Sequence, residues 1–250
     1  MTLRHTALIP RRRRWPLLIA IVLTLLLPGE ALSSSYASVL WHGARTRNVV
    51  ALTFDDGWGV TNCGRVVDIL MRTKTPATFL PTANWVSAAP TFWRHVADLG
   101  FPFANHSISH PYMTRLYYAS QYAQINTARL RIENIIKKPM VRVFRPPYGA
   151  YNATTRRAAY AAGFPRLLLW DATFADSSRR PGGGYWPLSS YLRTATKGIA
   201  GSVILGHCGS LVDYQILEQV IASYRARGFT FVTVPQILGL PGATAMTFPG

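Results

Sequence analysis

The sequence predicts an α/β protein in which helices cover a parallel sheet. Short apolar runs of strand length alternate with longer segments of helical periodicity about seven times along the chain, and this alternation is typical of parallel sheets. Both a closed barrel and an open, doubly wound sheet fit the pattern. With 250 residues, of which 49% are hydrophobic, the chain is large enough for a full core.

Seven segments are expected to be strands, because each is a short apolar run bounded by turn or helix signals. In chain order they are 48–54, 77–80, 101–105, 141–144, 166–170, 202–205 and 229–232. The segments between them have apolar residues three and four apart, as a helix that packs on a sheet requires. The expected helices are 61–73, 91–99, 120–136, 153–162 and 214–227. Gly100 and Gly163 suit the ends of two of them.

The first 37 residues predict a secretory signal peptide rather than part of the fold. Arginines at 11–14 form a basic head, an apolar run follows at 17–27, and 35–37 fit a cleavage site with small residues. This apolar run is too short to span a bilayer, which takes roughly 20 residues. An uncleaved membrane anchor that recruits neighbouring residues is the alternative. Either predicts a secreted or cell-envelope protein.

The folded domain is expected over 38–240, and the Gly/Pro-rich tail at 241–250 is expected to be loose. The chain is strongly basic, with 27 lysines and arginines against 10 acids and a formal charge of +17. That balance suits an anionic environment such as a cell wall, a membrane surface or a nucleic acid. Export and the lack of interleaved basic and aromatic repeats argue against a nucleic-acid binder. Nothing indicates an obligate protein partner.

Titratable side chains gather where the expected strands end. The carboxyl ends of parallel strands lie at one edge of a sheet or barrel, so these side chains are expected to form one active site. In chain order they are Asp55, Asp56, His106, His110, Arg145, Asp171, Asp176 and His207.

Two histidines and an acid in this group suggest a metal site. His106 and His110 are four residues apart, so on a helical turn both rings would point the same way. A carboxylate from another strand end would complete a set that leaves positions open for water and substrate. Asp55 and Asp56 are neighbours on an extended segment and point different ways. One can bind the metal while the other takes a proton from water; alone, however, the Asp-Asp-Gly sequence also fits a simple turn.

Several of these stretches together resemble the polysaccharide deacetylases with a NodB homology domain, carbohydrate esterase family 4. They are TFDDG at 53–57, PATFL at 76–80, NHSISHP at 105–111, FRPPYG at 144–149, LWD at 169–171 with Asp176, and ILGH at 204–207. The motifs occur in the family's order and with its spacing, over about residues 50–235. The resemblance implies a metal-dependent hydrolase on an incomplete (β/α)7-type barrel.

The resemblance also implies a role for each motif residue. Asp56, His106 and His110 match the ligands of a divalent metal, with Zn²⁺ favoured and Co²⁺, Ni²⁺ or Mn²⁺ as alternatives. Asp55 matches the general base, and Arg145 matches the arginine that pairs with it. Tyr148 matches the backbone donor to the oxyanion, and Leu205 the wall of the acetyl pocket. His207 matches the general acid, and Asp176 the acid that orients it. All six lie around the metal in the family.

The sequence departs from the family pattern in three places. Trp58 follows the first motif where proline is common, and Ala83 stands where glycine is usual; both are expected near the substrate side. The third departure is in the fourth motif. Many members have an acid three residues before the second aspartate of the fourth motif and a tryptophan after it, where this chain has Thr173 and Ser177. The departure puts the role of Asp176 in doubt and makes Asp171 the alternative partner of His207.

The only two cysteines, Cys63 and Cys208, follow the first and last motifs. In the barrel that the resemblance implies, these strand ends are neighbours, so we expect a disulfide near the rim of the site. Two small buried residues are the alternative.

An exported, cationic deacetylase would meet an N-acetylated glycan such as peptidoglycan or chitin. Two other functions are compatible with the same fold. An O-deacetylase acting on acetylated xylan would use the same site. A non-catalytic glycan-binding protein would be expected to lack Asp55, a metal ligand or His207, and this chain has them all.

Overall fold

The computed structural model describes residues 35–248. The predicted signal peptide therefore lies outside the described residues except for 35–37. Ala37, its last residue, is buried, and its backbone N–H and C=O both bond to Arg156. The folded domain thus includes the residue just before the expected boundary. Within the described range, no helix is both long and apolar enough to cross a membrane.

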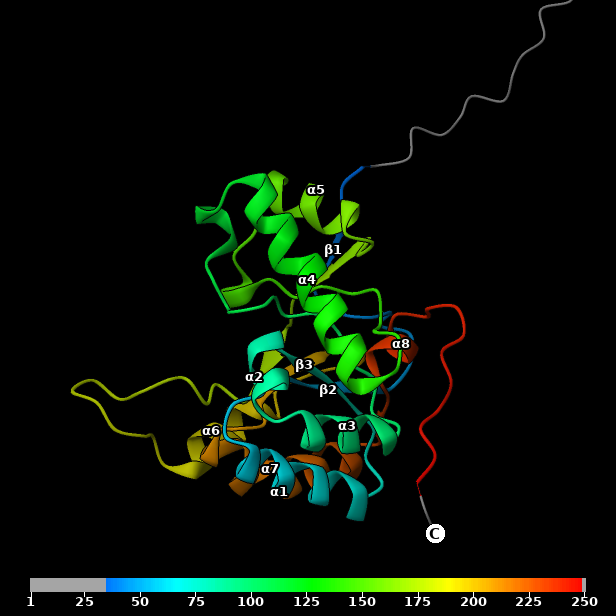
Figure 1. Ribbon diagram of the computed structural model, residues 1–250. Coiled ribbons are helices and arrows are strands. Elements are labelled where there is room, and N and C mark those ends of the chain that lie inside the picture. Colours follow the sequence, from blue (N-terminus) through cyan, green and yellow to red (C-terminus); the bar gives the residue numbers. More distant parts are fainter. Residues whose placement is uncertain (1–34, 249–250) are drawn as a thin grey trace, which may run out of the picture. The chain divides into compact units, whose positions relative to one another are not determined.

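The strands pair in parallel, as expected for an α/β fold. A five-stranded sheet has the order β3-β2-β6-β5, with β7 also paired to β2, and a second sheet joins β1 to β4. Strands β2 and β3 of the first sheet and β1 of the second are labelled in Figure 1. The strands are β1 Ser38–Leu40, β2 Val49–Asp56, β3 Ala77–Pro81, β4 Arg166–Leu168, β5 Ala172–Thr173, β6 Val203–His207 and β7 Thr230–Phe231.

Single bridges continue the circle of strands between β3 and β4. Phe79 pairs with Phe103, Asn105 with Phe144, and Phe144 with Leu167, all in parallel. The expected strands at 101–105 and 141–144 are therefore only bridges, and that prediction was wrong. Pro102 and Pro146 lie beside these bridges and have no N–H to extend a ladder. A ring of short parallel segments with gaps confirms the incomplete (β/α) barrel.

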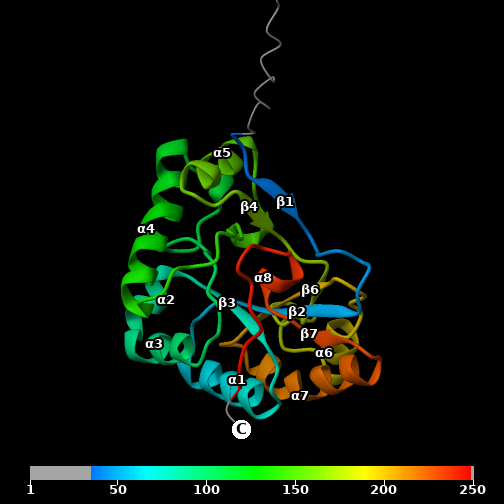
Figure 2. The same cartoon turned by 90° about the vertical axis from the view of Figure 1, so that its right-hand side faces the viewer.

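Helices surround the strands (Figure 2). The five expected helices are present, with ends that differ by at most three residues. The helices are α1 Val60–Arg72, α2 Ala83–Ala88, α3 Pro90–Asp98, α4 Tyr118–Ile136, α5 Ala153–Ala161, α6 Leu188–Ala195, α7 Leu211–Ala226 and α8 Val234–Ile237, with short 3-10 turns η1 Met113–Arg115 and η2 Pro147–Gly149. Sequence reasoning missed α2, α6, α8, β1 and β5, which are short or lack a clear apolar period.

Strand β2 organises the core and positions the site. Its side chains are almost wholly buried, and Phe54 stacks on Phe79 of β3. In the register with β6, Asp55 lies opposite His207. Asp55, Asp56 and His207 are the last residues of their strands rather than the first residues after them. The parallel pairing thus places base and acid candidates from distant parts of the chain side by side.

The predicted disulfide between Cys63 and Cys208 is present. It joins α1 to the turn that follows β6, across 145 residues of sequence. Both residues are buried. The bond therefore ties the residue next to His207 to the helix that follows the Asp55–Asp56 pair.

Candidate active site

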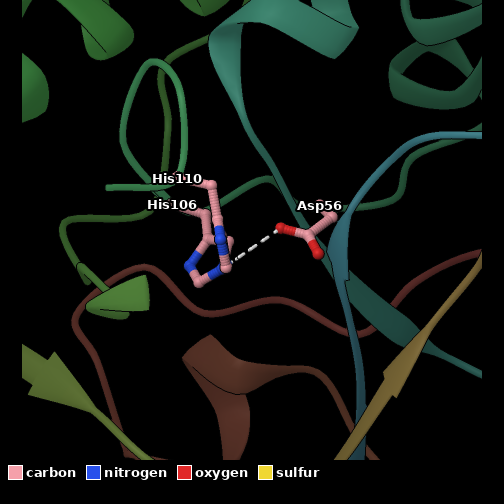
Figure 3. Close-up of side chains that lie close together, drawn as sticks. All are labelled: Asp56, His106 and His110. Atoms are coloured by element: carbon pink, nitrogen blue, oxygen red, sulfur yellow. Dashed lines mark ion pairs between the residues drawn. The ribbon is translucent and has the colours of Figure 1, made fainter. Parts of the chain in front are cut away.

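Asp56, His106 and His110 converge on one point at the carboxyl edge of the barrel (Figure 3). The Oδ1 atom of Asp56 lies 3.5 Å from His106 Nε2 and 3.3 Å from His110 Nε2. The other ring nitrogen of His106, Nδ1, lies 2.8 Å from the carbonyl oxygen of Arg145. Because a carbonyl only accepts, Nδ1 carries the proton, and the lone pair of Nε2 is free to face Asp56.

The loop that carries the two histidines is not the helical turn that the spacing suggested. Ser107 and His110 have left-handed backbones, with φ of 73° and 61°. The Asn105 side chain accepts from the Ser107 N–H, and the Ser107 hydroxyl accepts from the His110 N–H. The Gln124 side chain of α4 accepts from the N–H groups of Ile108 and Ser109, which lie between them. Side-chain hydrogen bonds therefore bring the rings together where helix periodicity does not.

These three side chains fit a divalent cation. Asp56 Oδ1 is buried and has no hydrogen-bond partner. Burial lowers the pKa values of His106 and His110, which favours neutral imidazoles. Burial also raises the pKa of Asp56, a penalty on its charged form that a bound cation would offset. One carboxylate oxygen and two nitrogen lone pairs, all within 4.8 Å of one another, lack a donor between them. A metal ion is the partner that such a set of acceptors suits.

Asp55 lies beside the three candidate ligands and pairs with Arg145. The Nη1 atom of Arg145 donates to Asp55 Oδ1 at 2.6 Å and to Thr53 Oγ1 at 3.0 Å. Its other nitrogens donate to the carbonyl oxygens of Leu168 and Leu169. Both charged groups are buried, and each of the three guanidinium nitrogens of Arg145 donates at least one hydrogen bond. The second oxygen of Asp55, Oδ2, faces His106 Nε2 at 3.7 Å.

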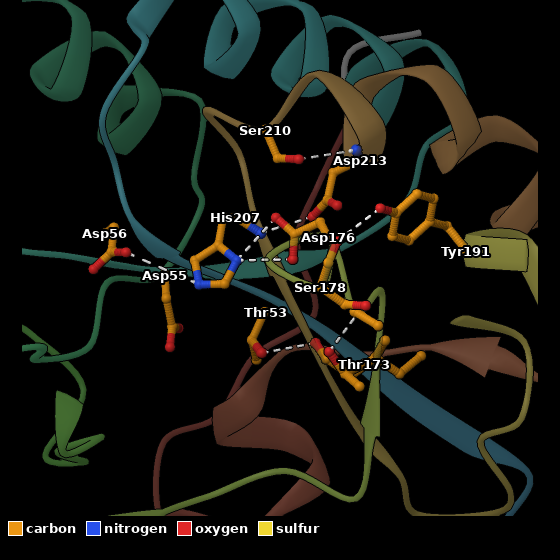
Figure 4. A network of polar contacts seen from close by, with 12 residues as sticks. Thr53, Asp55, Asp56, Thr173, Asp176, Ser178, Tyr191, His207, Ser210 and Asp213 are labelled. Carbon is orange, nitrogen blue, oxygen red and sulfur yellow. Dashed lines mark hydrogen bonds and ion pairs between the residues drawn. The ribbon is translucent and has the colours of Figure 1, made fainter. Parts of the chain in front are cut away.

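His207 approaches from the opposite strand and is held by Asp176 (Figure 4). Its Nδ1 lies 3.0 Å from both carboxylate oxygens of Asp176, and its Nε2 lies 3.9 Å from Asp56 Oδ2. Burial by itself lowers the pKa of His207. The hydrogen bond and charge of Asp176, helped by Asp55, outweigh burial and raise the pKa to about 9.

Asp171, the alternative partner of His207, is engaged elsewhere. Its carboxylate accepts from Arg45, from the Ser202 hydroxyl and from the Val203 N–H. Asp176 is reached instead through a left-handed residue, Ala175, with φ of 55°. The structure therefore places Asp176, and not Asp171, against the histidine.

A family model described as polysaccharide deacetylase matches residues 42–167 of the chain. The chain belongs to the polysaccharide deacetylase family. The match covers half the chain and includes the segments that hold Asp55, Asp56, His106, His110 and Arg145.

Two curated relatives align over most of this deacetylase. One is a peptidoglycan-N-acetylglucosamine deacetylase of Bacillus cereus, 27% identical over 203 residues, which are 80% of this chain and 92% of the relative. The other is a bifunctional xylanase/xylan deacetylase of Cellvibrio japonicus, 30% identical over 188 residues, which are 74% of this chain. The chain spans only 27% of that longer protein.

A solved structure shows the same fold. A CE4 family pseudoenzyme from Bacillus anthracis superposes with a TM-score of 0.73 at 21% identity, over 80% of this chain and 68% of the other. A likeness at this identity concerns the fold alone. Chemistry must therefore be argued from the side chains of this deacetylase.

The side chains of the deacetylase site enclose a cavity of about 360 Å³. Leu205, expected at the wall of the acetyl pocket, and Tyr148, expected to offer its backbone N–H to the oxyanion, both line it. Its other lining residues are Asp55, Asp56, Trp58, His106, His110, Pro146, Trp170, Ser177 and His207. Trp58 was expected near the substrate side as a departure from the family pattern. Trp170 was not expected in the cavity, although it directly precedes the motif aspartate Asp171, which is the signal that could have found it. Together with Leu205, the two tryptophans give the cavity an apolar wall.

A stack of rings at the rim was also missed. The Tyr148 ring packs edge-on against His110, with centroids 4.4 Å apart, and lies flat on Tyr112 at 3.9 Å. The Arg115 guanidinium lies over Tyr112 at 4.4 Å. Tyr148 has a left-handed backbone, with φ of 61°. The stack braces this strained residue against a candidate metal ligand, and no periodicity in the sequence signals it.

Proposed function

We propose that this protein is a metal-dependent N-deacetylase that removes acetyl groups from an extracellular polysaccharide containing N-acetylglucosamine, of the peptidoglycan or chitin type. One arrangement carries the proposal. A carboxylate paired with a buried arginine, Asp55, and a protonated imidazole, His207, flank the three acceptors that fit a metal. The match to the peptidoglycan deacetylase of Bacillus cereus over 92% of its length supports the substrate class.

Asp56, His106 and His110 would hold the metal, and we assign it as Zn²⁺ because one carboxylate and two imidazoles suit zinc in catalytic sites. Co²⁺, Ni²⁺ and Mn²⁺ accept the same donors. When bound, the ion supplies Lewis-acid chemistry, polarising the amide carbonyl and making water easier to deprotonate.

Asp55 acts as the general base through Oδ2. Its Oδ1 is occupied by the Arg145 guanidinium at 2.6 Å, so Oδ2 is the atom free to take a proton from the attacking water. Arg145 is itself held by three further acceptors, so it keeps the carboxylate in one orientation. The same pairing offsets the cost of burying the charge.

His207 acts as the general acid through Nε2. Asp176 holds Nδ1, so Nε2 is the nitrogen that faces the cavity and carries the proton to the leaving amine. An amine leaves poorly as an anion, and a pKa of about 9 keeps His207 protonated at neutral pH. The backbone N–H of Tyr148 is assigned to the oxyanion, and Leu205 with Trp170 to the acetyl methyl group.

We also propose that the protein is exported, to the cell envelope or beyond. The basic and apolar N-terminus and the Cys63–Cys208 disulfide support this, since disulfides persist in oxidising compartments.

The xylan deacetylase region of the Cellvibrio japonicus relative supports a second candidate, O-deacetylation of acetylated xylan. A glycan-binding protein without activity is disfavoured, because Asp55, the three candidate ligands and His207 are all present and close together.

The test is acetate release by the purified protein from N-acetylglucosamine oligomers and, in parallel, from acetylated xylan. Each is measured after chelation and after addition of Zn²⁺. We expect release from the N-acetylated oligomers with zinc, none after chelation, and loss of at least about 10²-fold in Asp55→Asn. Release from xylan alone would favour the second candidate. Glycan binding without release by the zinc-loaded protein would identify a binding protein, and activity untouched by chelation would refute the metal.

A further inference from the structure

Asp213 is a wholly buried acid directly behind His207 that the proposed mechanism does not use. It lies in the first turn of α7, and its side chain is 0% exposed. Its Oδ2 accepts from the backbone N–H of His207 at 2.7 Å (Figure 4). Its other oxygen, Oδ1, is buried without a hydrogen-bond partner. A buried carboxyl with an unpaired oxygen is costly, so its presence here calls for a physical reason.

Gly206 and Ser210 lie next to this carboxyl and determine where it can reach. A Cβ on Gly206 would meet Asp213 Oδ2 at 2.3 Å, so only glycine leaves room for it there. Ser210 and Asp213 have the spacing of a helix capping box. The Ser210 hydroxyl does accept from the Asp213 N–H, but the Ser210 N–H donates to the His207 carbonyl. The carboxyl therefore passes beyond its own helix cap and reaches the end of β6.

The surroundings of this carboxyl favour its neutral form. Burial raises the pKa of Asp213 well above its usual range, and the charge of Asp176 raises it further. The charge of His207, its backbone N–H and the Ser210 hydroxyl lower the pKa of Asp213, and burial outweighs them. A neutral carboxyl can still accept a hydrogen bond from an N–H through its carbonyl oxygen. In that form Asp213 would serve the His207 backbone without adding a second negative charge beside the Asp176–His207 pair.

We propose that Asp213 is a positioning residue for the general acid, holding the backbone of His207 while Asp176 holds its ring. Two separate contacts, at the backbone N–H and at Nδ1, then set where Nε2 points into the cavity. The inference rests on the proposed role of His207 in deacetylation. It requires an acceptor at position 213 and does not require a charge there.

The test compares Asp213→Leu, which fills the space without an acceptor, with Asp213→Asn, which keeps a carbonyl and is neutral. We expect Asp213→Leu to lower kcat by about 10- to 100-fold, the size expected for a misplaced catalytic group. KM and the affinity for Zn²⁺ should stay within about threefold, because the cavity wall and the three candidate ligands are untouched. Asp213→Asn should restore kcat to within about fivefold of the wild type and leave the basic limb of its pH profile in place.

Ser210→Ala is the matched control, since it removes the cap of the same helix turn and leaves the acceptor for His207. It should lower the unfolding midpoint without the loss of kcat. The proposal would be overturned if Asp213→Asn were as inactive as Asp213→Leu, or if Asp213→Leu kept the full kcat. It would also be overturned if the pH profile of Asp213→Asn were displaced to lower pH.

A measurement on the wild-type chain makes the outcome independent of whether the variants fold. The His207 amide should exchange slowly with deuterium in the zinc-loaded protein, and rapid exchange would overturn the proposal. This readout needs no substrate. A wild-type protein that releases no acetate but shows a protected amide would therefore refute the proposed function and not the contact.

Discussion

Replacing Asp176 by asparagine tests how the general acid is kept protonated. The pKa of His207 is raised from an ordinary 6.5 to about 9, mainly by the hydrogen bond and charge of Asp176 acting against burial. At 1.36 kcal/mol per pH unit, this difference is roughly 3 kcal/mol in favour of the charged ring. Asparagine removes the charge, and burial then draws the pKa of His207 back toward 6.5 or below.

The expected loss of activity depends on pH. With a pKa of about 9, the His207 ring is mostly protonated at pH 8.5. If its pKa falls to 6.5, only roughly 1% of the rings are protonated at that same pH. Protonation alone therefore lowers kcat by roughly 80-fold at pH 8.5 and by less than twofold at pH 6. Loss of ring orientation adds a factor that does not vary with pH. The assay is acetate release between pH 6 and 10 at fixed free Zn²⁺, with the His207 titration followed by NMR.

The stability of the folded protein should also depend on the protonation of His207. A folded-state pKa above the ordinary value stabilises the protein fully below about pH 6.5, and this contribution disappears as pH rises through about 9. The Asp176→Asn variant should therefore be less stable than the wild type at pH 6, and the gap should narrow toward pH 10.

Asp171→Asn is the control, because Asp171 bonds to Arg45, Ser202 and Val203 instead of His207. The fall in activity of Asp171→Asn at high pH should occur at the same pH as in the wild type. Wild-type and Asp176→Asn profiles that run parallel, or a His207 that still titrates near 9 in the variant, would refute the reasoning.

Three further outcomes are expected. Asp56→Ala should weaken Zn²⁺ binding at least about 10²-fold by calorimetry, because it removes the only carboxylate among the three candidate ligands; wild-type affinity would count against the site. Arg145→Lys should destabilise the protein by about 3–5 kcal/mol in urea unfolding, since an ammonium cannot supply the contacts of the guanidinium; a change under about 1 kcal/mol would contradict the buried pair. Replacing Cys63 and Cys208 by alanine should cost about 2–5 kcal/mol, because the bond closes 145 residues of chain; unchanged stability would show that the bond restrains nothing.

The sequence alone was enough for the class of fold and for most of the candidate residues. Alternating apolar runs and amphipathic segments report on local periodicity, and local periodicity decides which segments become strands and helices. Asp55 and Asp56 stand out because acids rarely end a buried apolar run, and the order of the motifs added the family. The disulfide followed once the family implied a barrel.

Only the tertiary structure decided which of these residues touch. It chose Asp176 over Asp171, turned the His106–His110 segment into a loop held by Asn105 and Gln124, and buried Asp213 behind His207. Each of these contacts depends on a left-handed residue or on groups from separate elements. A linear pattern shows the period of one segment. The direction of a side chain after a strand depends on the packing of several distant segments at once, and therefore emerges only when the barrel is assembled.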